Sequence, residues 1–190
     1  LRKDGTIFPM DLSVSEVKLE NRRLFTGFIR DITARKEAEE SLLHYAALVE
    51  SSDDAIIGKT LDGYITSWNR GAELVFGYSR GEMVGKHISI LIPDDRKDEE
   101  PGILAKIKRG ESVDHFETVR RRKDGSLIDI SVTVSPIRDA DGQITGASKV
   151  ARDITGRKQL EKEILEISDR EPRRIGHDLH DGLCQHLAGI

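Results

Sequence analysis

The sequence predicts an α+β fold, with antiparallel strands joined by tight turns and short helices between two groups of strands. Three observations lead to this prediction: a long internal repeat, Asp-Gly turns beside segments of alternating polarity, and charged helical segments after each copy of the repeat. With 190 residues, 37% of them hydrophobic, the chain can form one or two small domains.

The repeat pairs the N-terminal segment with a segment in the second half of the chain. The first copy reads RKDGTIFPMDLSV and then FTGFIRDITARK, and the second reads RKDGSLIDISVTV and then ITGASKVARDITGRK. Solenoid repeats recur every ~20–50 residues. The longer period here indicates tandem domains instead.

The second copy predicts three consecutive antiparallel strands. Asp124-Gly125 is a tight-turn signal, because glycine accepts a positive φ without steric cost. The apolar residues after it have largely period-two spacing, typical of a strand with one buried face: Leu127, Ile128, Ile130, Val132 and Val134. VDHFETVRRR precedes this strand, and ITGASKVARDI follows it after a turn at 139–143.

Two shorter strands and several helices come before these three strands. AIIGK and GYITSWN flank the turn Leu61-Asp62-Gly63, and Trp68 is predicted to be a core residue. Three helical pieces follow: NRGAELVFGYS, SRGEMVGKHIS and DRKDEEPGILAKIKRG. The predicted order is therefore two strands, several short helices and three strands.

This order resembles that of a PAS sensor domain. The resemblance is carried by ITSWNRGAELVFGYSRGEMVGKHISILIPDDR, the RRKDG hairpin and the closing ARDITGRK. It implies a PAS fold: a five-stranded antiparallel sheet with short helices over one face, enclosing a small cavity for a small-molecule ligand. Residues 1–33 resemble the last strands of a preceding PAS domain. By the same resemblance, Asp31-Ile32-Thr33 and Asp153-Ile154-Thr155 are joints that relay a signal from each sheet to the next helix.

A charged helical segment follows each of these triads. Each carries an apolar stripe of a/d type: Ala38, Leu42, Tyr45 and Val49 on the first, and Leu160, Ile164 and Ile167 on the second. One interpretation is a surface helix packed on its own domain, and the other is a parallel coiled coil in a homodimer. The position of each helix, between one predicted domain and the next, favours the coiled coil.

The segment from Arg173 on reads RRIGHDLHDGLCQHLAGI, with His180 and Asp181 beside an apolar stripe. It resembles the dimerisation and phosphoacceptor helix of sensor histidine kinases of the nitrate/nitrite-sensor type. The resemblance implies that His180 is the phosphoacceptor, that Asp181 is its acid/base partner, and that Gln185 positions a water for dephosphorylation. The chemistry suits this assignment, because a neutral imidazole with a pKa of ~6.5 is a nucleophile near pH 7.

The chain thus divides into five predicted parts. They are the C-terminal strands of a truncated first PAS domain (1–33), a helical linker (34–45), a second PAS domain (46–156), a coiled-coil linker (157–171) and the start of the phosphoacceptor helix (172–190). Ser168 to Glu171 reads as a capping box with Pro172 after it, so a new helix or a kink is expected there. Because both ends fall in mid-pattern, we expect a piece of a longer protein.

The predicted function is that of the sensory and dimerisation region of a two-component sensor histidine kinase. In the parent protein, a kinase domain absent from this chain would use ATP, and a response-regulator receiver domain would take the phosphoryl group from His180. The chain alone should be inactive. One alternative is a PAS interaction or ligand-binding module without a phosphotransfer role. Another is a PAS module ahead of a cyclic-dinucleotide enzyme, which the LHDGLCQHL segment disfavours.

No cofactor is predicted for the second PAS domain. Haem-binding PAS domains carry a histidine on the helix before the last three strands, and here Glu99 falls roughly at that place. Flavin-binding relatives need a nearby cysteine, whereas the one cysteine, Cys184, lies in another part of the chain. The sequence therefore leaves haem open for the truncated first copy only. His177, His180 and Cys184 share a helix face but supply only three ligands, so no metal site is predicted.

The charge balance and the hydropathy of the chain bear on which partners it binds and where in the cell it lies. The chain has 30 basic and 34 acidic residues, a near balance that disfavours a nucleic-acid partner. No apolar run approaches the ~20 residues needed to cross a bilayer. A single cysteine also suits a reducing compartment, so we predict a cytoplasmic protein. Any membrane anchor of the parent protein would lie in segments outside this sequence.

Overall fold

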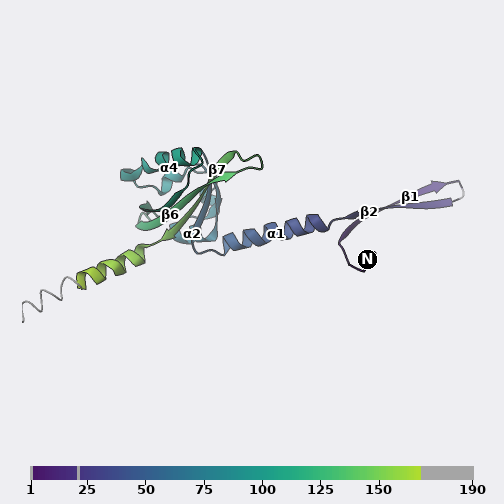
Figure 1. The fold of residues 1–190 in the computed structure, drawn as a ribbon, viewed down its shortest axis with the longest axis horizontal. Helices are drawn as coiled ribbons and strands as arrows, with labels where there is room; N and C mark the ends of the chain where they lie inside the picture. Colours follow the sequence, from purple (N-terminus) through teal and green to yellow (C-terminus); the bar gives the residue numbers. More distant parts are fainter. Residues whose placement is uncertain (1, 21, 168–190) are drawn as a thin grey trace, which may run out of the picture. The chain divides into compact units, whose positions relative to one another are not determined.

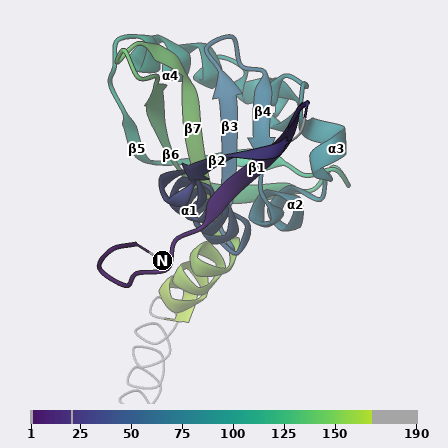
Figure 2. The ribbon, with the colours of Figure 1, turned by 90° about the vertical axis from the view of Figure 1, so that its right-hand side faces the viewer.

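The computed structural model describes residues 2–20 and 22–167, in a chain that divides after Ser51 into two compact units (Figure 1). The second unit contains a five-stranded sheet. Its strands are β3 (Ala55–Thr60), β4 (Ile65–Trp68), β5 (Val113–Arg121), β6 (Leu127–Arg138) and β7 (Ile144–Asp153). They lie in the order β4-β3-β7-β6-β5, and every neighbouring pair is antiparallel (Figure 2). The predicted five-stranded antiparallel sheet is confirmed.

Short helices connect β4 to β5. They are α2 (Arg70–Phe76), α3 (Arg80–Met83), two 3-10 turns (Ile88–Leu91 and Asp94–Arg96) and α4 (Glu99–Lys108). Asn69 begins α2, because its side-chain oxygen accepts the backbone N–H groups of Ala72 at 2.9 Å and Ile56 at 2.8 Å. One amide thus holds the start of α2 against β3. At the other end of this region, α4 packs against β5 and β6.

The core of the second unit lies between the sheet and these helices. Alternate residues of β6 are buried, as the period-two pattern predicts: Ile128, Ile130, Val132 and Val134. Trp68 is 1% exposed and packs beside Phe76, while its indole N–H donates to the backbone oxygen of Tyr78 at 3.1 Å. The prediction that Trp68 is a core residue is confirmed.

The first unit is a hairpin followed by a helix. Strands β1 (Met10–Leu19) and β2 (Arg22–Asp31) pair antiparallel, and α1 spans Thr33–Glu50. Met10 faces Asp31 and Leu12 faces Ile29, just as Ile130 faces Asp153 and Val132 faces Ala151 in the second unit. Equivalent residues of the two repeat copies are therefore paired with the same strand register.

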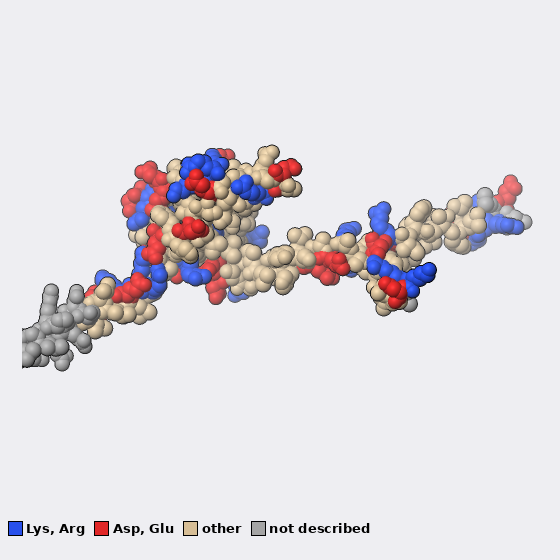
Figure 3. Space-filling view, viewed as in Figure 1, with Lys and Arg blue, Asp and Glu red and all other residues tan. Residues whose placement is uncertain are grey.

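The hairpin leaves its apolar face exposed within the described residues. Met10, Leu12 and Val14 are each more than half exposed, whereas the equivalent residues of β6 are fully buried. Figure 3 shows most of the hairpin as uncharged surface between charged ends. Both units thus have the alternating sequence pattern of a half-buried sheet, but only in the second unit are the apolar residues of that pattern buried.

The helices after the two triads also keep their apolar stripes exposed. α1 has no buried residue, and it continues to Glu50, past residue 45 at which the predicted linker ends. The helix after β7 occupies 155–167 of the described residues, and its Leu160, Ile164 and Ile167 are all more than 60% exposed. None of the helices in 2–20 and 22–167 has the length and hydropathy to cross a membrane.

Candidate functional site

The predicted joint Asp153-Ile154-Thr155 lies where β7 ends and the next helix begins. The Asp153 carboxylate accepts the backbone N–H of Thr155 at 2.8 Å and the guanidinium of Arg122 at 2.7 Å. Burial raises the pKa of Asp153, but the hydrogen bonds from Thr155 and the charge of Arg122 outweigh burial, so the pKa lies below its ordinary value. Asp153 is therefore a carboxylate at neutral pH, and it joins the first turn of the helix to Arg122, the residue that follows β5.

Ile154 and Thr155 attach the same turn to the start of β6. Ile154 is 5% exposed, and its backbone N–H donates to the backbone oxygen of Asp129 at 2.9 Å. The hydroxyl of Thr155 accepts the backbone N–H of Asp129 at 3.2 Å. The triad therefore bonds to β6 through the backbone and packs one apolar side chain into the core.

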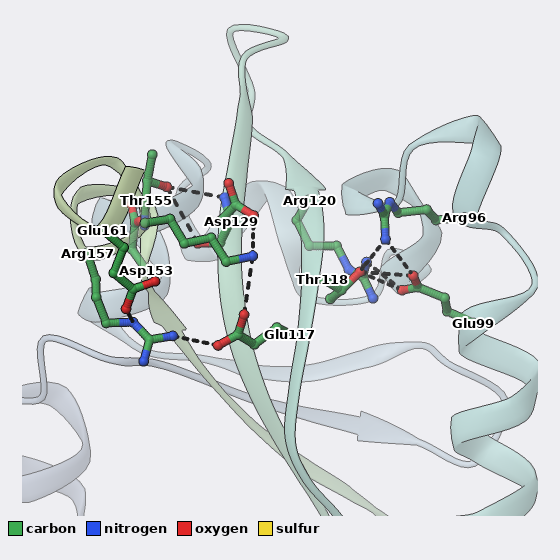
Figure 4. A network of polar contacts seen from close by, with 11 residues as sticks. Arg96, Glu99, Glu117, Thr118, Arg120, Asp129, Asp153, Thr155, Arg157 and Glu161 are labelled. Carbon is green, nitrogen blue, oxygen red and sulfur yellow. Dashed lines mark hydrogen bonds and ion pairs between the residues drawn. The ribbon is translucent and has the colours of Figure 1, made fainter. Parts of the chain in front are cut away.

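The first turn of the helix adds charged contacts with the sheet (Figure 4). Lys158 donates to Asp129 at 2.9 Å and lies 3.2 Å from the Glu117 carboxylate. Arg157 donates to the same Glu117 at 2.5 Å. Two cations at the start of the helix are thus held by carboxylates of β5 and β6.

The first unit repeats three of the contacts of this joint. Asp31 accepts the backbone N–H of Thr33 at 2.9 Å and forms an ion pair with Arg2, as Asp153 does with Arg122. The backbone N–H of Ile32 donates to Pro9 at 3.1 Å, where Ile154 donates to Asp129. Each of the two predicted triads therefore lies at a strand-to-helix joint, and the two joints share these three contacts.

A second polar cluster, which the sequence analysis did not predict, lies inside the second unit next to α4, and Figure 4 shows its Glu99, Thr118 and Arg120. Three basic side chains on strands β3, β5 and β7 are at most 2% exposed: Lys59, Arg120 and Lys149. Two consecutive glutamates at the start of α4 face them. Glu100 forms a buried ion pair with Lys59, and Glu99 accepts from Arg120 at 2.8 Å.

Glu99 is the centre of a network that also includes Thr118 and Arg96. The Thr118 hydroxyl donates to Glu99 at 2.9 Å, and Arg96 donates to it at 3.2 Å. Burial raises the pKa of Glu99, but the hydrogen bonds from Arg120 and Thr118 and the charge of Arg120 outweigh this, and the net pKa is lowered. Glu99, which the sequence places near the haem-ligand position of other PAS domains, here binds three protein donors.

When Lys149 is protonated, the buried side chains of the cluster carry three positive charges and face two carboxylates. Burial, followed by the neighbouring charges of Arg120 and Lys59, lowers the pKa of Lys149 from 10.5 to about 7, and Glu100 and Glu99 offset only part of that shift. Arg120 bonds through Nη1, whereas its Nε and Nη2 are buried without a hydrogen-bond partner among the described residues.

A sequence signal for the cluster does exist. Lys149 alternates with Ala147 and Ala151, so the period of the strand puts it on the buried face with them. Arg120 stands two residues after Thr118, which is also buried. The predicted phosphoacceptor site of His180, Asp181 and Gln185 lies outside the described residues, as do the capping box and Cys184.

Two protein families match most of the chain. The family described as "PAS fold" matches residues 43–154, and the family described as "PAS domain" matches residues 1–34. The PAS domain of a protein from Colwellia psychrerythraea has a solved structure with a TM-score of 0.57 and 28% identity, over 61% of this chain and 98% of that one.

Two curated relatives are signalling proteins. Two-component system protein A of Emericella nidulans is 39% identical over 119 residues, which are 62% of this chain and 17% of that protein. Signal transduction histidine-protein kinase AtoS of Escherichia coli is 29% identical over 119 residues, 63% of this chain and 19% of that protein. The chain therefore spans less than a fifth of the length of either relative. Its own match to the PAS fold covers more than half of its residues, and the chain belongs to the PAS family.

Proposed function

We propose that this chain is the sensory and dimerisation region of a two-component sensor histidine kinase. The observation that carries the proposal is the joint at Asp153-Ile154-Thr155, where the last strand of the PAS sheet is bonded to a helix that precedes His180 in the sequence. The printed names of the two curated relatives, a two-component protein and a histidine kinase, support the same class.

In this proposal a change in the PAS core moves β5 and β6 and, with them, the carboxylates of Glu117 and Asp129. Because Arg157 and Lys158 are held by those carboxylates, the helix tilts or rotates. In a homodimer the exposed stripe of Leu160, Ile164 and Ile167 packs against the partner helix. The movement then changes how His180 meets the kinase domain.

His180 is the proposed phosphoacceptor of the nitrate/nitrite-sensor type, with Asp181 as acid/base partner. The imidazole attacks the γ-phosphorus of ATP with one ring nitrogen, the bond from that phosphorus to the β,γ-bridging oxygen breaks and ADP leaves, and a neighbouring carboxylate stabilises the imidazolium that forms. ATP is bound by a kinase domain that this chain does not contain. Gln185 orients the water that removes the phosphoryl group from the receiver domain of a response regulator. The whole relay is proposed to operate in the cytoplasm.

The test joins this chain to the kinase domain that follows it in the parent protein and supplies γ-labelled ATP. Wild type and His177→Gln, a matched change three residues away, should both gain an acid-labile, base-stable label, while His180→Gln should gain none. Equal labelling of all three proteins, or no label on any, would contradict the assignment. The protein would then be a PAS binding module without phosphotransfer.

A further inference from the structure

Lys149 is a buried lysine on the middle strand of the sheet. It lies on β7 and is 2% exposed. Its strand partners are Ile57 on β3 and Val134 on β6, and both are apolar. In the part of the chain that the structure describes, Lys149 has charged neighbours but makes no hydrogen bond or ion pair. Because a charged amine is costly in such surroundings, the folded domain holds this proton weakly.

The two carboxylates of the cluster are already paired with other cations. Glu100 forms an ion pair with Lys59 of β3, and Glu99 accepts from Arg120 of β5 at 2.8 Å. Both glutamates stand at the start of α4, so the two pairs attach its first turn to two strands of the sheet. In the strand order β3-β7-β6-β5, Lys149 lies between the strands that carry these pairs.

Lys149 gains and loses its proton near neutral pH. Burial, followed by the charges of Arg120 and Lys59, lowers its pKa to about 7. Glu100 and Glu99 offset part of that shift. These four charged groups face Lys149 from β5, β3 and α4, while its neighbour on β6 is apolar. Above about pH 7 two buried cations face two carboxylates, and below about pH 7 a third cation joins them.

Strand β5 connects this cluster with the joint at the end of β7 (Figure 4). Thr118 and Glu117 are consecutive residues of β5, so their side chains point to opposite faces of the sheet. On the inner face, Thr118 donates to Glu99 at 2.9 Å. On the other face, Glu117 accepts from Arg157 at 2.5 Å and lies 3.2 Å from Lys158. The start of α4 and the first turn of the helix after β7 are thus both bonded to β5.

We propose that this cluster is a proton switch for the contact between α4 and the sheet, and that acidification is the stimulus to which the second unit responds. When the Lys149 amine is neutral, Glu99 and Glu100 keep their present partners and hold the start of α4. When the amine takes up a proton, the new ammonium group competes for these carboxylates, and the first turn of α4 moves on the sheet. This inference deepens the proposed sensory function, on which its signalling consequence rests, because it names the stimulus.

Nuclear magnetic resonance of the 190-residue chain from about pH 6 to about pH 8 tests the switch, because exposed lysines, with a pKa of ~10.4, stay charged over this range. The Cε signal of one lysine should titrate with a midpoint near pH 7 and should be missing in Lys149→Met. The backbone amides of 99–103 should titrate with the same midpoint in the wild type and keep their high-pH positions in Lys149→Met. Lys162→Met, on the exposed helix, is the control and should leave both titrations in place.

Histidines titrate in the same range, with an ordinary pKa of ~6.5, and Lys149→Met separates their effect from that of the lysine. The absence of a lysine signal with a midpoint in this range would overturn the proposal, and the wild-type chain alone is sufficient for that observation. Equal shifts of the 99–103 amides in the wild type and in Lys149→Met would overturn it as well, because a histidine would then be their cause.

Lys149→Arg is the second variant, and it replaces Lys149→Met if that protein does not fold in a thermal melt. An arginine stays charged at every pH in the titration, so the 99–103 amides should keep their low-pH positions throughout. A wild-type titration of these amides in Lys149→Arg would contradict the switch. None of these measurements uses phosphotransfer, so this proposal and the proposed function fail separately.

Discussion

Lys149 shows how a single residue sets a pH dependence for the whole domain. It is buried against the apolar side of the sheet, with Lys59 and Arg120 as neighbouring cations and with Glu99 and Glu100 as the facing carboxylates. The folded domain therefore binds the lysine proton less tightly than the unfolded chain, whose lysines have a pKa near 10.5.

The sign of the effect follows from the protons bound in each state. Between about pH 7 and pH 10.5 the unfolded chain holds the Lys149 proton and the folded domain does not, so stability rises with pH in this window. Below about pH 7 both states are protonated, and the full cost of the buried charge is present.

Lys149→Met is expected to stabilise the second unit at pH 6 and to stabilise it less at pH 9, because it removes a charge that is costly only when protonated. Urea unfolding followed by Trp68 fluorescence measures this, since Trp68 is the one tryptophan and is buried in the second unit. Lys162→Met, on the exposed helix, is the control and should change neither value. A stabilisation that is equal at both pH values would show that Lys149 is neutral or paired throughout.

At the scale of the element, Asp153 joins β7 to the helix that follows. Its carboxylate receives a backbone N–H and a guanidinium, each a hydrogen bond that involves a charged group. The same element occurs in the first unit at Asp31, so the chain contains two joints of one design.

Asp153→Ala should lower the free energy of unfolding of the second unit by about 1–3 kcal/mol, because it leaves Arg122 and the Thr155 N–H without their acceptor. The same fluorescence-detected urea titration measures the loss. Asp141→Ala, in the exposed 139–143 turn, is a matched control that should cost less than about 0.5 kcal/mol. Equal losses in the two variants would mean that the joint is not held by Asp153.

At the scale of the whole molecule, two helices keep apolar stripes in contact with solvent. Leu160, Ile164 and Ile167 lie on one face of the helix after β7, and an a/d stripe of this kind is stabilised when a second helix covers it. We expect a homodimer in which this helix pairs with its counterpart.

Ile164→Glu should shift the 190-residue chain toward monomer in sedimentation-velocity experiments, because it places two like charges inside the proposed helix pair. Lys162→Glu introduces the same side chain on a different face of the helix and should leave the dimer intact. A wild-type chain that is monomeric at high micromolar concentration would contradict the coiled-coil interpretation and favour a surface helix.

The amino-acid sequence by itself determined the strands, their order along the chain and the two joints. Strand polarity alternates with period two, Asp-Gly turns separate the strands, and the repeated DIT triads stand at the ends of strands, so local patterns are sufficient for these features. Trp68 in the core followed from the same patterns, whereas the single five-stranded sheet followed from the resemblance to PAS domains.

Only the tertiary structure decided how Arg120, Lys149 and Glu99 are brought together. Each comes from a different element, and each is of a charged residue type that is usually exposed. No local sequence pattern therefore predicts that the three lie together in the interior of one domain. The alternation of β7 places Lys149 inward, but its electrostatic cost depends on which neighbours the sheet order supplies. The order β4-β3-β7-β6-β5 and the packing of α4 on β5 and β6 arise from long-range pairing, and this is the physical reason that the charge cluster could not be read from sequence spacing.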